Sequence, residues 1–361
     1  DILINWLKSQ KSDVILITRG DPLWFGIGRI ILENFSKEEV NFYPSNTSMQ
    51  LAFSKIKVPW QNTTFVSIHG RDSTKLVEAL KSKTPNLVII TDSKNKGLEI
   101  IQKNVLELNL NDFYDFWICE ELGFEKENIR KVNVKENLPC DISDLNIAVL
   151  LKKEKDNMQT ESLLFGLKDI DFCTFEDRPN LLTKREIRIQ ILADLELPEH
   201  GIIWDIGAGC GSIGLEAIKL RPFLKLYSID KRIGSKQLIK KNSQKLGVKP
   251  AEIFEEDINN LLNSKNSDLF NKANRVILGG CTKKTKLRII RHLSKNMMTG
   301  NIIVIPIIDI EAIKEIRDLL KINNFKIDLN LIQTYKSLSI SEGLRLEPNN
   351  PVFLLKGKKL F

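Results

Sequence analysis

The chain has 361 residues, of which 42% are hydrophobic and 28% are charged, a composition typical of a globular protein with more than one domain. No apolar stretch approaches the ~20 residues that span a bilayer. The five cysteines show no CxxC spacing, so the sequence carries no signature of a disulfide framework or a zinc site. We expect no metal site, no membrane partner and a cytoplasmic location.

The net charge of +8 is unevenly distributed along the chain. Residues 1–150 carry a net charge of −2, and the remainder carries +10. A basic second half favours an acidic partner, either nucleic acid or a small molecule with several carboxylates. A lysine-rich solvated surface would have the same composition.

Short apolar runs that end in loops predict strands in the first part of the chain. They are DVILITRGDP at 13–22, TTFVSIHGRD at 63–72 and NLVIITD at 86–92, with helix-like stretches between them. A further strand, in 145–152, passes into polar and mostly charged residues. We therefore predict a first α/β domain at 1–152, a linker at 153–160 and a second domain at 161–361.

The second domain repeats the order strand, turn, helix. Strands are predicted at Ile202–Ile206, Lys225–Ile229, Ala251–Phe254, Arg275–Leu278 and Ile302–Pro306, with helices such as Gly214–Leu220 and Ser235–Leu246 between them. Two strand-like stretches, 325–340 and 351–359, close the chain with no helix between them. This order predicts a Rossmann-like, doubly wound parallel sheet with a C-terminal antiparallel hairpin at its edge.

The most informative stretch is IIWDIGAGCGSIGLEA at 202–217, which places three glycines between a strand and a helix. Gly207, Gly209 and Gly211 can adopt positive φ and let a ligand approach the backbone. Dinucleotide loops space their glycines as GxGxxG, whereas this loop reads DxGxGxG and has Ser212 in the third register. The spacing therefore favours S-adenosylmethionine, which has no pyrophosphate. The alternative is that the glycines only tighten helix–strand packing.

Two more acids follow the next strands of the same domain. Asp230 ends the second strand, where a carboxylate can accept hydrogen bonds from both ribose hydroxyls. Asp257 ends the third strand and is placed to face an adenine edge, with a backbone group of Ile258 beside it. The order strand, DxGxGxG, helix, strand, acid, strand, acid predicts methyl transfer from S-adenosylmethionine.

The two halves together resemble the precorrin methyltransferases of cobalamin biosynthesis that fuse a tetrapyrrole C-methylase to a decarboxylating class I methyltransferase domain. The first half is similar through RGDPLWFGIGR (19–29), YPSNTSMQLAFSKIKVPWQN (43–62), VSIHGRD (66–72) and FWICEELGFEKENIR (116–130). The second half is similar through LLTKREIR (181–188), WDIGAGCGSIGLEA and VILGGCTKK (276–284). The resemblance covers nearly the whole chain.

For the second domain, the loop and the resemblance together give candidate cofactor contacts at Thr183, Asp205, Gly207, Ala208, Gly209, Cys210, Gly211, Asp230, Asp257 and Ile258. Thr183 is also a candidate helix N-cap, because Glu186 follows in capping-box spacing. Candidate substrate contacts are Gly279 and Gly280, where a flat macrocycle could approach the backbone, and the basic residues Arg178, Lys184, Arg185, Arg188, Lys283 and Lys284. The alternative for the basic residues is a solvated face.

For the first domain, the resemblance implies that Gly20, Asp21, Thr47 and Ser48 border a second cofactor site, and that His69 and Arg71 lie near the substrate cleft. The alternatives are a plain turn for the Gly-Asp-Pro segment and an ordinary surface loop for His69 and Arg71. Tetrapyrrole methylases begin with a strand and a GxGPG loop, and this chain starts downstream of both. We therefore expect the domain to lack its first strand, which leaves methyl transfer by this domain open.

The reaction implied by the resemblance is methylation of a precorrin of the 6Y or 6B type at two meso carbons, with decarboxylation of an acetate side chain, giving a precorrin-8X type product. The implied cofactor is S-adenosylmethionine and the implied partner is a polycarboxylate tetrapyrrole. A homo-oligomer is expected and a nucleic-acid partner is not. Methyl transfer to an electron-rich ring carbon depends mainly on positioning, so no catalytic residue is assigned.

Two other functions fit parts of the sequence. A basic Rossmann-like domain would suit an RNA methyltransferase, although only 7% of the residues are aromatic and no RNA-binding module is recognised. A non-enzymatic first domain that only orients the second would account for the missing GxGPG loop.

Overall fold

The structure is a computed structural model that describes residues 2–18, 20–92, 96–153, 163–179, 181–263, 267–341 and 343–361. The chain divides into two compact units, one containing residues 1–106 and 110–154 and the other containing residues 155–361 and 107–109. The predicted linker, 153–160, lies outside the described residues except for Lys153. Among the described residues, no helix combines the length and the apolar character needed to cross a membrane.

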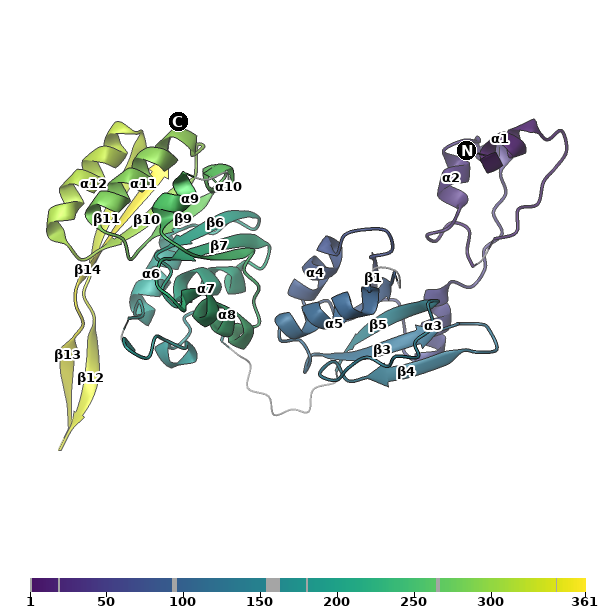
Figure 1. Ribbon diagram of the computed structural model, residues 1–361, viewed down its shortest axis with the longest axis horizontal. Coiled ribbons are helices and arrows are strands. Elements are labelled where there is room, and N and C mark those ends of the chain that lie inside the picture. The colour runs from purple at the N-terminus through teal and green to yellow at the C-terminus, as the bar shows by residue number, and fades with distance from the viewer. Residues whose placement is uncertain are drawn as a thin grey trace. The chain divides into compact units, whose positions relative to one another are not determined.

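The first unit contains one sheet, and the helices within residues 48–107 lie beside it (Figure 1). Its elements are α1 (Ile2–Ser9), α2 (Gly28–Leu32), η1 (Lys37–Glu39), α3 (Ser48–Ile56), β1 (Thr63–Ser67), α4 (Thr74–Lys81), β2 (Asn86–Ile90), α5 (Gly97–Glu107), β3 (Tyr114–Glu120), β4 (Asn128–Val132) and β5 (Asn146–Lys152). The strand order is β1-β2-β5-β3-β4, with β1 and β2 parallel and the other pairs antiparallel. Phe53 of α3 packs on Val88 and Val149 of the sheet.

The strand predicted within 13–22 is wrong. Residues 13–18 have no regular secondary structure, and the side chains of Ile15 and Ile17 are each 90% exposed. An apolar run indicates a strand only when a neighbouring strand pairs with its backbone. Among the described strands of the five-stranded sheet, none pairs with this segment.

The second unit has the predicted alternation of strands and helices. Its elements are η3 (Asp169–Asp171), α6 (Arg185–Asp194), β6 (Gly201–Ile206), α7 (Ser212–Leu220), β7 (Leu224–Asp230), α8 (Ser235–Leu246), β8 (Glu252–Glu255), α9 (Ile258–Leu262), α10 (Ser267–Asn271), β9 (Arg275–Leu278), α11 (Lys283–Asn296), β10 (Ile302–Ile307), α12 (Ile310–Ile322), β11 (Phe325–Ile332), β12 (Tyr335–Ile340), β13 (Gly343–Pro348) and β14 (Val352–Lys359).

Its seven-stranded sheet has the order β11-β14-β10-β9-β6-β7-β8. The strands β6 to β10 are parallel, which confirms the predicted doubly wound sheet. From β6 the chain builds outward through β7 to β8 and then returns to place β9 on the other side of β6. The pair β6 and β9 is therefore the topological switch point, where α/β sheets bind their ligands.

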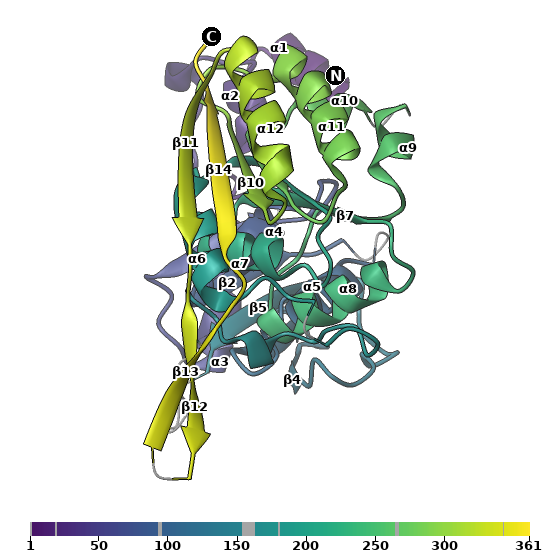
Figure 2. The same cartoon turned by 90° about the vertical axis from the view of Figure 1, so that its left-hand side faces the viewer.

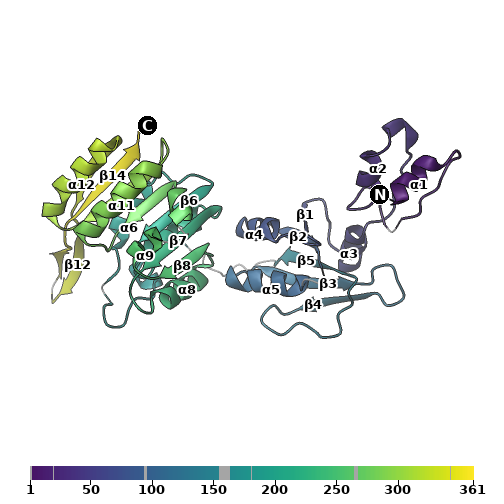
Figure 3. The same ribbon diagram turned by 45° about the horizontal axis from the view of Figure 1, so that its top comes forward.

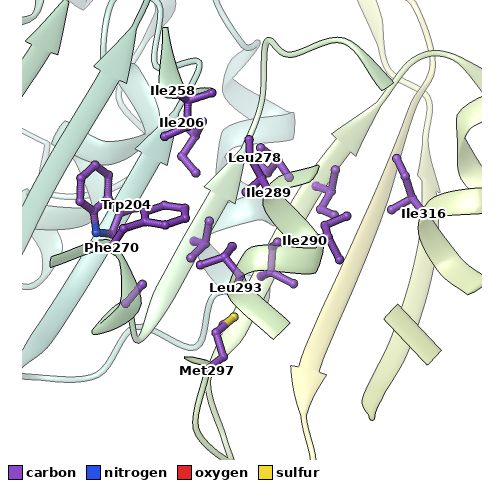
Figure 4. Close-up of a cluster of buried hydrophobic side chains, with 14 of the residues drawn as sticks. Trp204, Ile206, Ile258, Phe270, Leu278, Ile289, Ile290, Leu293, Met297 and Ile316 are labelled. Carbon is purple, nitrogen blue, oxygen red and sulfur yellow. The ribbon is translucent and has the colours of Figure 1, made fainter. Parts of the chain in front are cut away.

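Helices cover both faces of this sheet (Figure 3), and the side chains of β6 alternate between them as a strand requires. Trp204 and Ile206 point into a core shared with α9 to α12 (Figure 4). Ile203 points into the opposite core with α6, α7 and α8. Burial on both faces explains why β6 reads as a continuous apolar run.

The C-terminal strands form the predicted antiparallel edge. β14 lies between β10 and β11 and is antiparallel to both, so β11 is the edge strand. The sequence did not predict the second, two-stranded sheet of β12 and β13. This hairpin continues beyond the main sheet (Figure 2), and every residue of β13 is exposed.

Candidate functional site

The candidate site lies at the switch point, beyond the carboxyl ends of β6 and β9. A cavity of about 890 Å³ opens there, near the upper end of the ~300–1,000 Å³ of small-molecule sites. One wall is the glycine loop after β6, and the facing wall is Gly279–Thr282 after β9. The carboxyl end of β10 and the segment that follows it, Pro306–Asp309, complete the floor.

The glycines of the loop have two separate roles. Gly207, Gly209 and Gly211 all have positive φ, at 71°, 59° and 80°, as predicted. A Cβ on Gly207 would lie 2.8 Å from the carbonyl oxygen of Gly279, whereas a Cβ on Gly209 would meet nothing within 4 Å. Gly207 therefore allows close packing of the two loops, and Gly209 leaves its backbone open toward the cavity that it lines.

Asp230 fastens the loop to the end of β7. Its Oδ2 accepts a hydrogen bond from the Gly209 amide at 2.7 Å, and its Oδ1 accepts one from the Arg232 amide at 3.0 Å. The side chain is buried, but each carboxylate oxygen has a second lone pair. Asp230 can therefore accept further hydrogen bonds from a ligand hydroxyl without releasing the loop.

Asp205 lies beneath the loop, is 2% exposed and lines the cavity. Its Oδ2 accepts a hydrogen bond from the Gly214 amide at 3.1 Å. Burial, helped by the nearby charge of Asp230, raises the pKa of Asp205 to about 7, although the hydrogen bond from the Gly214 amide opposes the shift. The carboxyl group is thus poised to ionise when a cation approaches.

A second, smaller cavity of about 70 Å³ adjoins the first and is lined by Asp230, Asp257 and Ile258. Asp257 is the N-cap of α9, with its side chain accepting from the Asn259 amide at 2.9 Å. The three residues predicted to hold the nucleoside thus line one depression. Gly280 and Arg232 line both cavities.

The structure separates the predicted basic contacts into two groups. Lys184 and Lys283 line the larger cavity, and so do Thr183 and the predicted backbone contacts Gly279 and Gly280. The residues Arg178, Arg185 and Lys284 do not line either cavity. Arg178 is exposed beside Asp177, and Arg185 donates to the carbonyl oxygen of Gly166 at 2.7 Å. A substrate contact at these three positions is therefore not supported by the geometry.

The prediction for Arg188 is wrong. Its side chain is fully buried and forms ion pairs with Glu216 at 3.2 Å and with Asp169 at 2.7 Å. It also donates to the carbonyl oxygens of Leu167 and Thr183. With its donors engaged in the protein interior, the guanidinium cannot reach a carboxylate in the cavity, and it instead holds the segment before α6 in place.

The N-cap prediction for Thr183 is also wrong. Helix α6 begins at Arg185, its N-cap is Lys184, and no side-chain hydrogen bond caps it. Thr183 lies one residue further out, and its carbonyl oxygen accepts from Arg188. The side chain at position 183 is thus not needed by the helix and remains a lining group of the cavity.

The remaining loop residues Ala208 and Cys210 line the cavity, as does Cys281. Burial raises the pKa of Cys210, and it raises the pKa of Cys281 to about 11. Both side chains are therefore neutral thiols near neutral pH, in keeping with small packing residues rather than nucleophiles. Among the described residues, no cluster of three metal-ligating side chains is found.

Sequence reasoning missed several lining residues. The most notable is Lys286, which is buried in the wall beside Cys281. Others come from the base of the β12–β13 hairpin, namely Thr334 and Pro348–Asn350. The Asn349 amide donates to the Thr334 hydroxyl at 2.9 Å, which joins the two ends of the hairpin. In the sequence, these hairpin residues are marked only by their positions next to strands. Many other residues share such positions, so the sequence could not single them out.

In the first unit, the predicted residues lie in local turns and caps. Asp21 accepts a hydrogen bond from the Leu23 amide at 2.8 Å. Thr47 caps α3 in a capping box with Gln50, directly before Ser48. A Cβ on Gly20 would lie 3.8 Å from the carbonyl oxygen of Asn46, so these two turns meet.

The loop with His69 and Arg71 approaches the same segment. The Arg71 guanidinium lies 6.0 Å from the centre of the Phe25 ring, and His69 Nδ1 lies 3.2 Å from the carbonyl oxygen of Thr91. Gly20 and Arg71 thus each approach another predicted segment or its neighbour, whereas the printed contact of His69 is with Thr91 at the end of β2. The Thr47 hydroxyl is engaged with its own helix.

Comparisons with known proteins identify relatives of this chain. Residues 4–137 match the family model of tetrapyrrole (corrin/porphyrin) methylases. The chain is 24% identical to a precorrin-6Y C(5,15)-methyltransferase [decarboxylating] of Sinorhizobium sp over 256 residues, which are 70% of this chain and 60% of that protein. It therefore spans less than two thirds of that relative's length.

Two further relatives each match just over half of the chain. A protein of Sulfolobus acidocaldarius named "Probable cobalt-precorrin-6B C(15)-methyltransferase (decarboxylating)" is 28% identical over 196 residues, which are 54% of this chain and 97% of that protein. The solved structure of a precorrin-6Y C5,15-methyltransferase from Geobacter metallireducens has a TM-score of 0.49 and 22% identity, covering 55% of this chain and all of that one. The family model described as the precorrin methyltransferase domain matches residues 174–359, just over half of the chain. The chain belongs to the precorrin methyltransferase domain family.

Proposed function

We propose that the second unit binds S-adenosylmethionine at the switch point and transfers its methyl group to a carbon of a precorrin, with decarboxylation of an acetate side chain. The observation that carries this proposal is the open backbone of Gly209, which faces the cavity and is fixed by the Asp230 carboxylate. The family match and the names of the relatives supply the substrate class.

The lining residues fit this cofactor. Asp230 would accept the ribose hydroxyls, and Asp257 with the backbone of Ile258 would face the adenine, because these three line the smaller cavity. The loop Gly207–Gly211 and Thr183 would border the methionine end. S-adenosylmethionine supplies an electrophilic methyl group on a positively charged sulfur. The buried carboxyl of Asp205 lines the same wall and would favour that positive charge once ionised.

The substrate would enter from the side of Gly279 and Gly280, where the absence of side chains lets a flat ring system approach the backbone. Lys184 and Lys283, which both line the larger cavity, would contact its carboxylates. Positioning of an electron-rich carbon in line with the methyl group supplies most of the rate enhancement. We assign no general base, since the nucleophile needs none.

Decarboxylation requires that the breaking C–C bond stand perpendicular to the ring π system, so that its electrons enter the ring. Lining groups that fix the macrocycle plane would set this angle. We propose that the first unit contributes a second site for S-adenosylmethionine at Gly20, Asp21, Thr47 and Ser48, with His69 and Arg71 toward its substrate, and that the chain acts as a cytoplasmic homo-oligomer.

Mass spectrometry of the products made from a precorrin-6Y type substrate by the full chain tests this function. Two added methyl groups and one lost carboxyl group are expected. One methyl group with decarboxylation would restrict activity to the second unit and leave the first as a scaffold. Absence of a methylated precorrin, together with salt-sensitive retention of RNA in a filter-binding assay, would replace the proposal with an RNA methyltransferase.

A further inference from the structure

Lys286 is a buried cation whose charge has no partner in the described part of the chain. Its side chain is 8% exposed and lines the larger cavity. Its Nζ donates a hydrogen bond to the carbonyl oxygen of Pro306 at 3.0 Å. An ammonium group has three donors, so two of them are left without an acceptor among the described residues.

The neighbouring carboxylates interact with other groups. Glu315 is paired with Lys283, one turn earlier in α11 than Lys286, at 2.7 Å. Asp309 is the N-cap of α12, and its Oδ1 accepts from the Glu311 amide at 3.0 Å. Asp309 acts on Lys286 only as a nearby charge, and the dominant effect is burial, which lowers the pKa of Lys286.

Packing alone does not explain a lysine at this position. A buried ammonium without an anion costs folding free energy, and a single hydrogen bond to a carbonyl recovers only part of that cost. A methionine would fill a similar volume without the cost. Such an arrangement is expected where a bound ligand supplies the missing anion.

A second cation of the cavity wall, the half-buried Arg232, also has a nitrogen without a partner among the described residues. One terminal nitrogen of Arg232 is buried and has no hydrogen-bond partner in the described structure, while its guanidinium lies 5.5 Å from the centre of the Phe175 ring. The larger cavity is therefore lined by two cations with unused donors, Lys286 and Arg232. Both would gain from an anionic ligand.

We infer that Lys286 is the anchor of a carboxylate-binding subsite that holds one acid side chain of the tetrapyrrole. The inference rests on the proposed function for the class of ligand. Lys286 lies on the wall formed by α11 and the end of β10, beside Gly279–Thr282. The nucleoside would lie elsewhere, on the side of Asp230. A carboxylate beside Lys286 would accept the two free donors of the ammonium and compensate its charge.

The test compares the full chain with Lys286→Met, and with Lys295→Met as a control that removes an exposed charge from the last turn of the same helix. Binding of uroporphyrin, an octacarboxylate porphyrin, is measured by fluorescence titration, and binding of S-adenosylmethionine by isothermal titration. We expect Lys286→Met to weaken porphyrin binding roughly 10- to 100-fold, as for loss of a charge-assisted hydrogen bond. Cofactor affinity and the control should not change.

Thermal unfolding separates a binding role from a structural one. Because the variant removes an uncompensated buried charge, we expect its Tm to equal or exceed that of the original chain by a few degrees. A lower Tm with a parallel loss of binding would show that the lysine supports the fold and would overturn the inference. If Lys286→Met does not fold, Lys286→Gln keeps a donor for Pro306 and should give the same loss of porphyrin binding.

The remaining outcomes distinguish this inference from the proposed function. Unchanged porphyrin binding by Lys286→Met would overturn the subsite and leave the function standing. Weakened cofactor binding instead of porphyrin binding would assign the lysine to S-adenosylmethionine and overturn the subsite. If the unmodified chain binds the cofactor but no porphyrin, the proposal of a polycarboxylate substrate is wrong, and the carboxylate-binding subsite is wrong with it.

Discussion

At the scale of single residues, the ionisation of Asp205 should make the stability of the second unit depend on pH. Its pKa of about 7 lies far above that of a solvated aspartate, because the folded protein favours the protonated carboxyl. The contribution of Asp205 to the unfolding free energy is therefore fully present below about pH 4 and is lost as the pH rises through 7. Because Asp205→Asn does not titrate, the unfolding free energy of the original chain relative to the variant should fall by up to about 4 kcal/mol from pH 4 to pH 8. Calorimetric unfolding at several pH values measures this difference, and a flat difference would contradict it.

The same carboxyl predicts a pH dependence of ligand binding. A cation bound near Asp205 favours its ionised form, so binding of S-adenosylmethionine should release a proton and become tighter as the pH rises from 6 to 8. Isothermal titration in buffers of different ionisation enthalpy counts the released protons. In Asp205→Asn this pH dependence should disappear, and its persistence would assign the proton to another group.

Arg188 and Glu216 are a structural pair next to the site. Replacement of either partner leaves a buried charge without compensation, so Arg188→Met should lower the unfolding free energy of the second unit by roughly 3–5 kcal/mol. The double variant Arg188→Met, Glu216→Gln should cost less than the sum of the single variants, because neither charge remains. Denaturation followed by calorimetry tests this, and strict additivity would contradict the pairing.

At the scale of elements, the glycine loop gives a matched pair of substitutions. Gly207→Ala would place its Cβ 2.8 Å from a backbone oxygen of the facing loop, so we expect a loss of several degrees in Tm. Gly209→Ala meets open space and costs only the roughly 1 kcal/mol of a positive φ, but its methyl group would project where the cofactor should lie. It should weaken cofactor binding more than tenfold with little change in Tm, and equal effects from both variants would contradict the two roles.

Strands β6, β9 and β10 could be predicted from sequence because each is a mostly buried apolar run that a loop follows. β8 is a short edge strand with two exposed glutamates and could be placed only by its position in the alternating order of strands and helices. The same rule failed at 13–18, where the run is apolar but none of the described strands pairs with it. It also missed β13, whose side chains are all exposed. A segment forms a strand only when another strand pairs with its backbone, and the local sequence does not show which segment that partner is.

The site shows the same limit. The glycine loop, Asp230 and Asp257 could be placed at one edge of the sheet because each lies at the end of a parallel strand or just after it. Arg188 and Lys286 were misassigned or missed because their environments depend on residues distant along the chain, Glu216 and Pro306. A basic residue on a helix looks alike in sequence whether it faces solvent, an ion pair or a cavity.

At the scale of the whole molecule, the second unit contains its own sheet, two cores and both cavities. A fragment of residues 163–361 should therefore fold alone and bind S-adenosylmethionine within roughly threefold of the full chain, a difference below about 1 kcal/mol. Titration of the fragment should give one site, and the full chain should give two if the first unit binds its own cofactor. A fragment that fails to bind would contradict this division of roles.

The position of β14 has a consequence for biosynthesis. Among the described strands, β11 pairs in the main sheet only with β14, which emerges from the ribosome about twenty residues later than the end of β11. Until β14 is synthesised, the strand that lies between β10 and β11 is missing, and each of them has an unpaired edge. Unpaired strand edges can pair with other nascent chains. Translation that pauses before residue 352 should therefore yield aggregates in which β10 and β11 pair with strands of other chains.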